Sequence, residues 1–154
     1  MERWKWSICS GRSESLPMGV RRKGREGALK ILYSLDLNPV SMNDACRQVL
    51  DFGEVPENTM MFTRELVGDT LQRLEEIDDH IQNASLKWEI SRMAAVDRNV
   101  LRLAVSELTG KTPKPVRVVL NEAIELAKKF GGEESGTFVN GVLDRVRIDL
   151  GMES

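Results

Sequence analysis

Apolar residues recur at three- and four-residue spacing along the C-terminal part of the chain, the period of one buried helix face. The first run stops at the Gly131-Gly132 pair, which is typical of a helix end. We therefore predict two amphipathic helices within 116–150, joined by a short acidic loop over 131–136. The apolar positions are Val116, Val119, Leu120, Ala123, Ala127 and Phe130, then Val139, Val142, Leu143, Val146 and Leu150.

Similar stripes predict three helices in the first half of the chain. The first covers about 20–35 and ends before an Asn-Pro dipeptide. Ser41, followed three residues later by Asp44, resembles a capping box and predicts the start of a short second helix. A continuous apolar stripe over 58–83 predicts one long third helix. These three helices can form one antiparallel bundle.

The second half continues with an irregular stretch and a strongly apolar helix. We expect 85–93 to be a tight connection with a single turn, in which Trp88 fills the junction between bundles. The helix that opens at Val96-Asp97 is apolar on nearly all sides, so it should be the most buried one. Together with the C-terminal hairpin it makes a second bundle. The prediction is an all-α fold with subdomains of about 18–84 and 85–154.

The composition agrees with this picture and narrows the possible partners. A chain of 154 residues, 41% hydrophobic and 30% charged, fits one compact soluble domain, and the 5% of aromatic residues favours helices over sheets. The net charge of -2 excludes a globally basic protein, so any nucleic-acid contact must come from a local cluster. Residues 1–17 lack a sustained period, and we expect a disordered extension upstream of a natural start at Met18.

Several classes of site find no support in the sequence. The two cysteines, Cys9 and Cys46, form no CxxC motif, which argues against zinc and disulfides and favours a reducing cytoplasm. No apolar run approaches the roughly 20 residues of a membrane span. His80 lies in a polar, acidic run typical of a solvated helix face, and no phosphate-binding glycine motif or nucleophile with a base is present. We therefore predict no enzyme, no cofactor and no metal site.

A cluster of cations at the start of the first helix points to RNA. The cluster consists of Arg21, Arg22, Lys23 and Arg25. It lies where the helix dipole is already positive, and phosphates would compensate for that arrangement. On an ideal helix Arg22 and Tyr33 share an edge about 16 Å long, so phosphate contacts and base stacking could act together. Phe138 lies off the centre of its apolar stripe and could add a second ring. From the residues alone, the preferred interpretations are a solvated helix end for the cations and a core position for both rings.

Three separated blocks resemble the NusB family of bacterial RNA-binding antitermination factors. After the arginine-rich start comes ALKILYSLDL, followed by WEISRMAAVDRNVLRLAVSEL and then PVRVVLNEAIELAKKFGGEESGTFVNGVLD. The resemblance covers about 20–150. It implies two small three-helix bundles packed across each other. It also implies binding to boxA, a short single-stranded RNA element, together with the ribosomal protein NusE. Other Nus factors and RNA polymerase would join indirectly, and some members form homodimers.

The resemblance also implies roles for individual residues. It assigns RNA binding to Arg21, Arg22, Lys23, Arg25, Tyr33, Glu134 and Phe138, and partner binding to Asp97. The loop over 133–138 would then lie beside Arg22 and Tyr33. Glu134 stands where an aspartate is familiar, and Gly24 and Gly27 stand where better helix formers are familiar. Each glycine costs up to about 1 kcal/mol against alanine, so the basic end should become ordered on contact with RNA.

Two other functions stay open at this point. The same helical domain occurs ahead of a catalytic domain in one family of ribosomal RNA methyltransferases. Because no Rossmann-like stretch follows the helices, we expect no active enzyme. The chain could also be a protein-interaction module that does not bind RNA.

Overall fold

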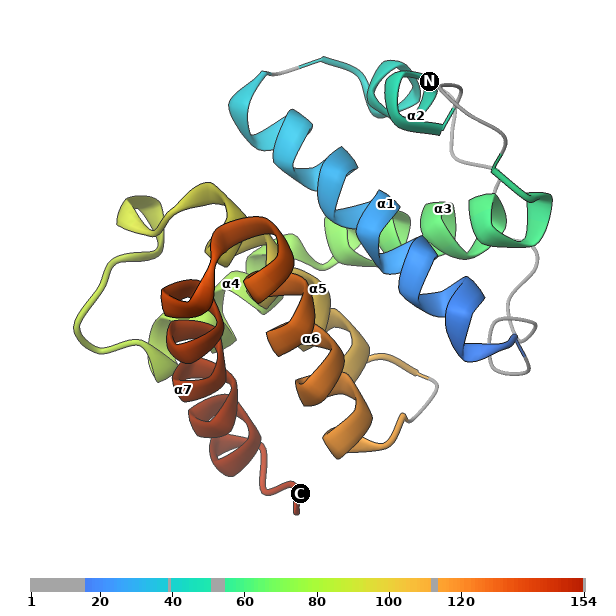
Figure 1. The fold of residues 1–154 in the computed structure, drawn as a ribbon. Helices are drawn as coiled ribbons and strands as arrows, with labels where there is room; N and C mark the ends of the chain where they lie inside the picture. The colour runs from blue at the N-terminus through green and yellow to red at the C-terminus, as the bar shows by residue number, and fades with distance from the viewer. Residues whose placement is uncertain (1–15, 39, 51–54, 112–113, 154) are drawn as a thin grey trace. The chain divides into compact units, whose positions relative to one another are not determined.

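Helices make up the regular structure of the residues that the computed structural model describes, 16–38, 40–50, 55–111 and 114–153. In chain order they are α1 (Met18–Leu37), α2 (Met42–Leu50), α3 (Glu57–Gln72), α4 (Leu74–Ala84), the 3-10 helix η3 (Ile90–Arg92), α5 (Ala95–Leu108), α6 (Val116–Gly131) and α7 (Glu133–Asp149). The predicted all-α class is confirmed (Figure 1). None of these helices is both long and apolar enough to cross a membrane. The chain divides into two compact units, Met1–Leu71 and Gln72–Ser154.

The first unit is organised around α1, which carries the basic cluster. The helix begins at Met18, directly after the extended Pro17 (φ -60°, ψ 154°), so the basic cluster lies near its N-terminal end. Its buried residues Ala28, Leu29, Ile31 and Leu32 form one face. Except for Leu16 and Pro17, the predicted extension over 1–17 lies outside the described residues.

A close approach between α1 and α3 explains a glycine that looked unfavourable in the sequence. The Thr63 hydroxyl on α3 donates a hydrogen bond of 3.1 Å to the carbonyl oxygen of Gly24. A Cβ at Gly24 would overlap the ring of Phe62, which is itself buried. Gly24 therefore allows the backbone of α1 to lie against α3.

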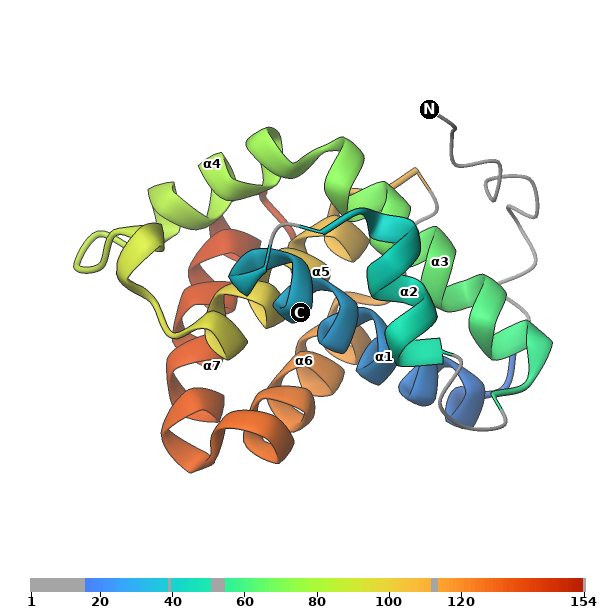
Figure 2. The same ribbon diagram turned by 90° about the horizontal axis from the view of Figure 1, so that it is seen from above.

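The short helix α2 lies beside α1 in the first unit (Figure 2). The backbone N–H of Asp44 donates to the Ser41 hydroxyl at 3.1 Å, so the predicted cap is confirmed. Asp44 also pairs with Arg47 at 3.4 Å, but both side chains are exposed and the pair contributes little. Cys46 faces inward and is buried.

The predicted long helix over 58–83 is wrong, because the chain breaks at Arg73 between α3 and α4. Arg73 has φ -115° and ψ 26°, outside the helical range. Its guanidinium donates hydrogen bonds of 2.8 Å to the Thr109 hydroxyl and to the carbonyl oxygen of Ser106, at the C-terminal end of α5. The second of these bonds satisfies a backbone carbonyl oxygen that the end of α5 leaves open. The sequence does not indicate this break, because the apolar stripe of α3 continues in phase in α4.

The second unit therefore begins with α4, so the chain divides between Leu71 and Gln72 and not near residue 85. The fully buried Ile77 and Ile81 lie on α4, which packs on α5 and α7. Within its described residues this unit contains four α-helices and η3 instead of the predicted three helices. The predicted single turn within 85–93 is confirmed by η3.

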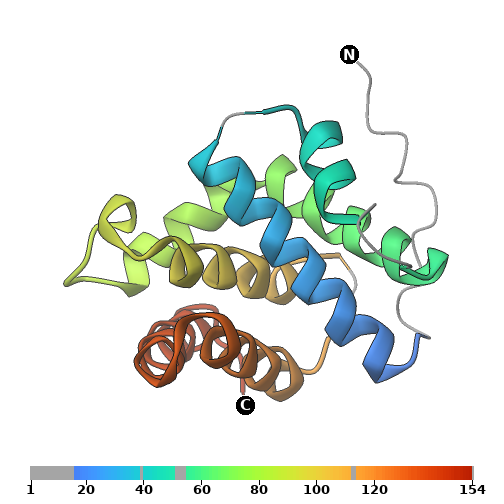
Figure 3. The same cartoon turned by 45° about the horizontal axis from the view of Figure 1, so that its top comes forward.

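Helix α5 is covered by its neighbours, as its apolar sequence predicted. Its buried residues are Asp97, Asn99, Val100, Leu101, Leu103, Ala104, Val105, Ser106, Glu107 and Leu108. Helices α4, α6 and α7 pack against it, and α6 and α7 lie side by side (Figure 3). The predicted C-terminal hairpin is thus confirmed.

The connection within this hairpin is shorter than the sequence suggested. Helix α6 ends at Gly131 and α7 begins at Glu133, so the predicted loop over 131–136 is wrong. Gly132 alone reverses the chain, with a φ of 94° that glycine adopts without strain. The next residues are helical, because Glu133 and Glu134 in the first turn interact favourably with the helix dipole.

Two glycine substitutions should change stability in opposite directions. Gly24→Ala should lower it, because overpacking against Phe62 costs about 1–3 kcal/mol and outweighs the roughly 1 kcal/mol gained in helix propensity. Gly68→Ala, in a helix and with no atom within 4 Å of its Cβ, should raise it by about 0.5–1 kcal/mol. Urea unfolding of both variants tests this, and equal shifts would contradict the close approach.

The thiol of Cys46 should be unreactive in the folded protein. Burial raises the pKa of Cys46 to about 11 from 9.0, and the nearby charge of Arg64 lowers it by less. At pH 8 the thiolate fraction is then about a hundredfold smaller than in the unfolded chain. In a Cys9→Ser variant, a disulfide reagent should therefore modify Cys46 at least about a hundredfold more slowly in buffer than in guanidinium chloride. Equal rates would show that Cys46 is accessible.

Candidate nucleic-acid interface

The N-terminal end of α1 combines a helix terminus with a cluster of cations. Its first turn contains no acidic residue, and Pro17 provides no side-chain cap. Arg22 and Lys23 are exposed, while Arg21 is half-buried. The partial positive charge of the helix N-terminus and the charge of these side chains therefore both attract an anion.

Arg25 differs from the other cations in the predicted cluster. Only 5% of the residue is exposed, and its guanidinium carbon lies 5.9 Å from the centroid of the Phe62 ring. A cation over a buried ring contributes to the packing of α1 on α3. RNA binding by Arg25 stays a prediction, and its burial favours a structural role.

The remaining exposed face of α1 continues toward Tyr33. This ring is 39% exposed, so it is partly available for stacking instead of fully in the core. Lys30 is also exposed and was missed in the sequence analysis. The sequence pattern that identifies Lys30 is its seven-residue spacing from Lys23, which places both cations on one side of the helix. Leu37, 52% exposed, extends the same face at its C-terminal end.

The predicted residues on the second unit lie on the first turns of α7 and not on a loop. Glu134 is exposed at the N-terminus of the helix, and Phe138 is half-buried one turn later. Between them Gly136 is buried, and a Cβ there would lie 2.7 Å from Cγ of Lys128. The helix holds Glu134 and Phe138 on one side, four residues apart.

The two groups of predicted RNA-binding residues belong to different units. Arg22 and Tyr33 lie in the first unit, and Glu134 and Phe138 in the second. That folding brings them side by side stays a prediction.

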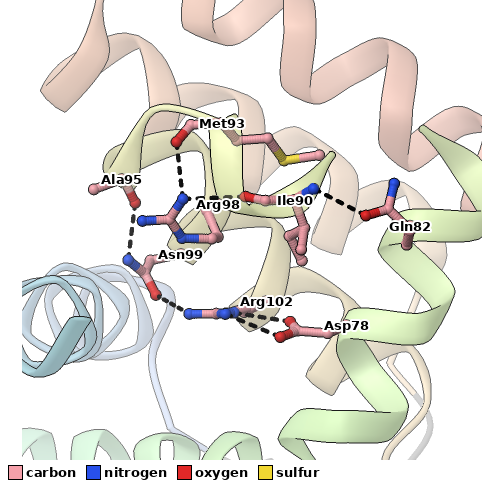
Figure 4. A network of polar contacts seen from close by, with 8 residues as sticks. All are labelled: Asp78, Gln82, Ile90, Met93, Ala95, Arg98, Asn99 and Arg102. Carbon is pink, nitrogen blue, oxygen red and sulfur yellow. Dashed lines mark hydrogen bonds and ion pairs between the residues drawn. The ribbon is translucent and has the colours of Figure 1, made fainter. Parts of the chain in front are cut away.

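Asp97, the predicted partner residue, lies in the first turn of α5 and is only 9% exposed. Its Oδ1 atom is buried and has no hydrogen-bond partner in the described part of the chain. The neighbouring Arg98 donates to the carbonyl oxygens of Ile90 and Met93, at 3.1 and 2.8 Å (Figure 4). The start of α5 is thereby tied to the segment that precedes it.

One turn further along α5, polar contacts join it to α4 (Figure 4). Arg102 makes two parallel hydrogen bonds to the Asp78 carboxylate, of 2.8 and 2.9 Å. Asn99, fully buried, donates to the carbonyl oxygen of Ala95 at 2.8 Å and accepts from Arg102 at 3.2 Å. A bidentate pair that is mostly buried holds a fixed geometry.

Metal ligands do not gather in the described residues, where no group of three or more His, Cys, Asp or Glu side chains could hold an ion. His80 lies half-buried on α4. The acidic residues of this helix include Asp78, which is already paired with Arg102.

Comparison with known proteins gives consistent matches over most of the chain. Residues 22–147 match the model of the NusB family. The transcription antitermination protein NusB of Desulfitobacterium hafniense (strain DSM 10664 / DCB-2) is 44% identical over 128 residues, which cover 82% of this chain and 86% of that protein. NusB of Anaeromyxobacter dehalogenans (strain 2CP-1 / ATCC BAA-258) is 47% identical over 131 residues, covering 84% and 92%. A crystal structure of antitermination factors NusB and NusE in complex with dsRNA matches with a TM-score of 0.79 and 30% identity, covering 86% of this chain and 99% of that one.

Replacement of Arg25 should affect stability more than replacement of an exposed cation. Arg25→Ala removes buried packing and the contact with Phe62, and should lower the free energy of unfolding by about 1–2 kcal/mol. Lys23→Ala, at an exposed position of the same helix, should stay within about 0.5 kcal/mol of the unmodified protein. Thermal and urea unfolding measure both, and equal stability of the two variants would contradict the structural role.

Proposed function

Because this chain belongs to the NusB family, we propose that it is a transcription antitermination factor that binds boxA-type single-stranded RNA together with NusE and promotes transcription of ribosomal RNA. The observation that carries the proposal is the similarity to a complex in which NusB and NusE bind RNA. That complex contains dsRNA, so the preference for a single strand is part of the proposal.

The exposed face of α1 supplies the electrostatic attraction. Arg22 and Lys23 lie at its positive end, and Lys30 lies two turns further along. These cations contact backbone phosphates, which gives affinity without sequence preference. Arg25 contributes by holding α1 against α3 near that end. The exposed cations therefore bind phosphate directly, whereas Arg25 acts through the packing of α1.

Base contacts come from partly exposed rings. Tyr33 offers one face to an unstacked base, and such stacking contributes about 1–3 kcal/mol per base. Phe138 is half-buried and offers the part of its ring that stays exposed. The Glu134 carboxylate repels phosphate, so its contact is with a donor on a base or with a ribose hydroxyl.

The NusE surface includes the start of α5 around Asp97. The burial of Asp97 means that its carboxylate acts mainly on the geometry of this helix end, with the direct contacts made by neighbouring residues.

Other Nus factors and RNA polymerase join through the RNA–NusE assembly. The protein works in the cytoplasm, without catalytic activity, and self-association would compete for its RNA surface.

A salt titration tests the RNA site. Arg22→Ala with Lys23→Ala should weaken binding of a labelled single-stranded boxA RNA at least tenfold. It should also reduce the magnitude of the slope of log K against log salt by about 1.4, because roughly 0.7 is lost per phosphate contact on a single strand. Fluorescence anisotropy, with and without NusE, measures both quantities. Arg47→Ala, which removes one exposed charge from α2, is the matched control.

The titration, together with a separate methyl-transfer assay, gives each rival function a distinct outcome. An unchanged slope in the double variant would overturn the site on α1. NusE binding without any RNA binding would indicate a protein-interaction module. Transfer of a methyl group from S-adenosylmethionine to RNA would indicate the methyltransferase alternative. Stronger binding of a duplex than of the single strand would contradict the boxA preference.

A further inference from the structure

Helices α3 and α4 are separated by a single residue. Helix α3 ends at Gln72, Arg73 has a backbone outside the helical range, and α4 begins at Leu74. The N–H of Ile77 already donates to the carbonyl oxygen of Arg73 at 2.9 Å, so helical hydrogen bonding resumes at once. A change in the backbone of this one residue would therefore join the two helices.

The sequence on both sides of the break favours one continuous helix. Arginine is a good helix former, so Arg73 does not interrupt a helix through its own propensity. The apolar stripe also crosses the break at intervals of three and four residues. Its buried and half-buried positions are Val67, Leu71, Leu74, Ile77 and Ile81. The break therefore has its cause outside α3 and α4.

The side chain of Arg73 supplies that cause. It is mostly buried, with 26% of its surface exposed. Its Nη1 atom donates to the Thr109 hydroxyl at 2.8 Å, and its Nη2 atom donates to the carbonyl and hydroxyl oxygens of Ser106 at 2.8 and 3.2 Å. Nη1 also lies 3.6 Å from the Glu76 carboxylate. The planar guanidinium makes these contacts at once, which the ammonium group of a lysine cannot do.

The end of α5 is shaped to receive this guanidinium. Ser106 is 3% exposed, and the Thr109 hydroxyl donates to the carbonyl oxygen of Val105 at 2.7 Å, which leaves its lone pairs for Arg73. A Cβ at Gly110 would lie 3.1 Å from the Ser106 carbonyl oxygen and 3.9 Å from Nη2 of Arg73. Glycine at this position therefore leaves space for the contact.

The contact lies directly after the boundary between the two compact units. This boundary falls between Leu71 and Gln72, and the chain crosses it once, from α3 into α4. Arg73 and its acceptors all belong to the second unit, so that unit alone determines where the helix is interrupted. The backbone of Arg73 (φ -115°, ψ 26°) then determines the direction in which α3 leaves the second unit.

We propose that Arg73 is a positioning residue for RNA binding, because its contact with the end of α5 sets the direction of the first unit. The inference rests on the proposed function, which assigns phosphate contacts to Arg22 and Lys23 on α1 and a base contact to Phe138 on α7. Two groups of contacts strengthen the binding of one ligand only when their separation matches that ligand. When the break is lost, α3 and α4 form one helix, and α1 and α7 no longer bind the same RNA molecule together.

Spin labels on both sides of the break test the structural step. Asn58→Cys on α3 and Asn83→Cys on α4 place the labels at exposed positions, in a background without other cysteines. In one continuous helix these positions (83 minus 58) would lie roughly 37 Å apart at about 1.5 Å per residue, and a bend shortens that distance. The distance should increase toward this value in Arg73→Ala. An unchanged distance would overturn the proposal.

Two further variants make the distance measurement specific. Arg145→Ala removes an exposed arginine and its pair with Asp149 from α7, and it should leave the distance unchanged. Arg73→Lys keeps the charge and the aliphatic stem but cannot bind both acceptors, so it should increase the distance part of the way. If Arg73→Ala does not fold, the unmodified distance in Arg73→Lys would overturn the proposal.

Binding of a labelled boxA RNA tests the functional step. In the unmodified background, Phe138→Leu keeps apolar packing but removes the ring, and should weaken binding about fivefold or more. In an Arg73→Ala background the same change should alter binding by less than about twofold, whereas Arg22→Ala with Lys23→Ala should still weaken it. Lower stability alone would not remove one contribution and keep the other. An equal effect of Phe138→Leu in both backgrounds would overturn the positioning role.

These measurements separate the inference from the proposed function. If the unmodified protein does not bind boxA RNA, the proposed function fails, and the positioning role fails with it. If the protein binds this RNA and the contribution of Phe138 persists in Arg73→Ala, only the positioning role fails.

Discussion

The burial of α5 is the constraint on which the second unit depends. A helix that is apolar on nearly all sides must be covered on nearly all sides, because each exposed Å² of apolar surface costs about 25 cal/mol. The chain meets this requirement with α4, α6 and α7, which all pack on α5. Helix α4 can do so only because the chain turns at Arg73. The break between α3 and α4 is thus a consequence of covering α5.

Polar contacts in the second unit follow from the same arrangement. Where α4 and α5 meet, Asp78 pairs with Arg102, and each end of α5 is joined to the chain beside it. Arg73 binds the C-terminal end, and Arg98 binds the segment before the N-terminal end. These arginines satisfy carbonyl oxygens that would otherwise lack partners. The connection between α4 and α5 is consequently a defined structure and not a free loop. Trp88 in this connection is 52% exposed, so the prediction that it fills the junction between bundles is wrong.

In the first unit, one close approach determines what the basic cluster can do. The backbone of α1 lies against α3 at Gly24, and this brings the adjacent Arg25 over the ring of Phe62. Arg22 and Lys23 stay exposed on the other side of the helix. Neighbouring cations therefore have different surroundings, because successive residues of a helix point in directions about 100° apart.

The sequence by itself determined the helical class, the approximate limits of most helices, the cap at Ser41 and the burial of α5. These features depend on periodicity and on neighbours a few residues away, so they can be read along the chain. It also contained the three blocks that resemble the family and the cations and ring of the candidate site.

Only the tertiary structure decided where the chain breaks at Arg73, which cation is buried, and that Trp88 is exposed. Those outcomes depend on contacts between distant residues, such as Thr63 with Gly24, 39 positions apart, and Arg73 with Thr109, 36 apart. Local pattern does not specify which distant groups will meet, because the packing of whole helices selects them.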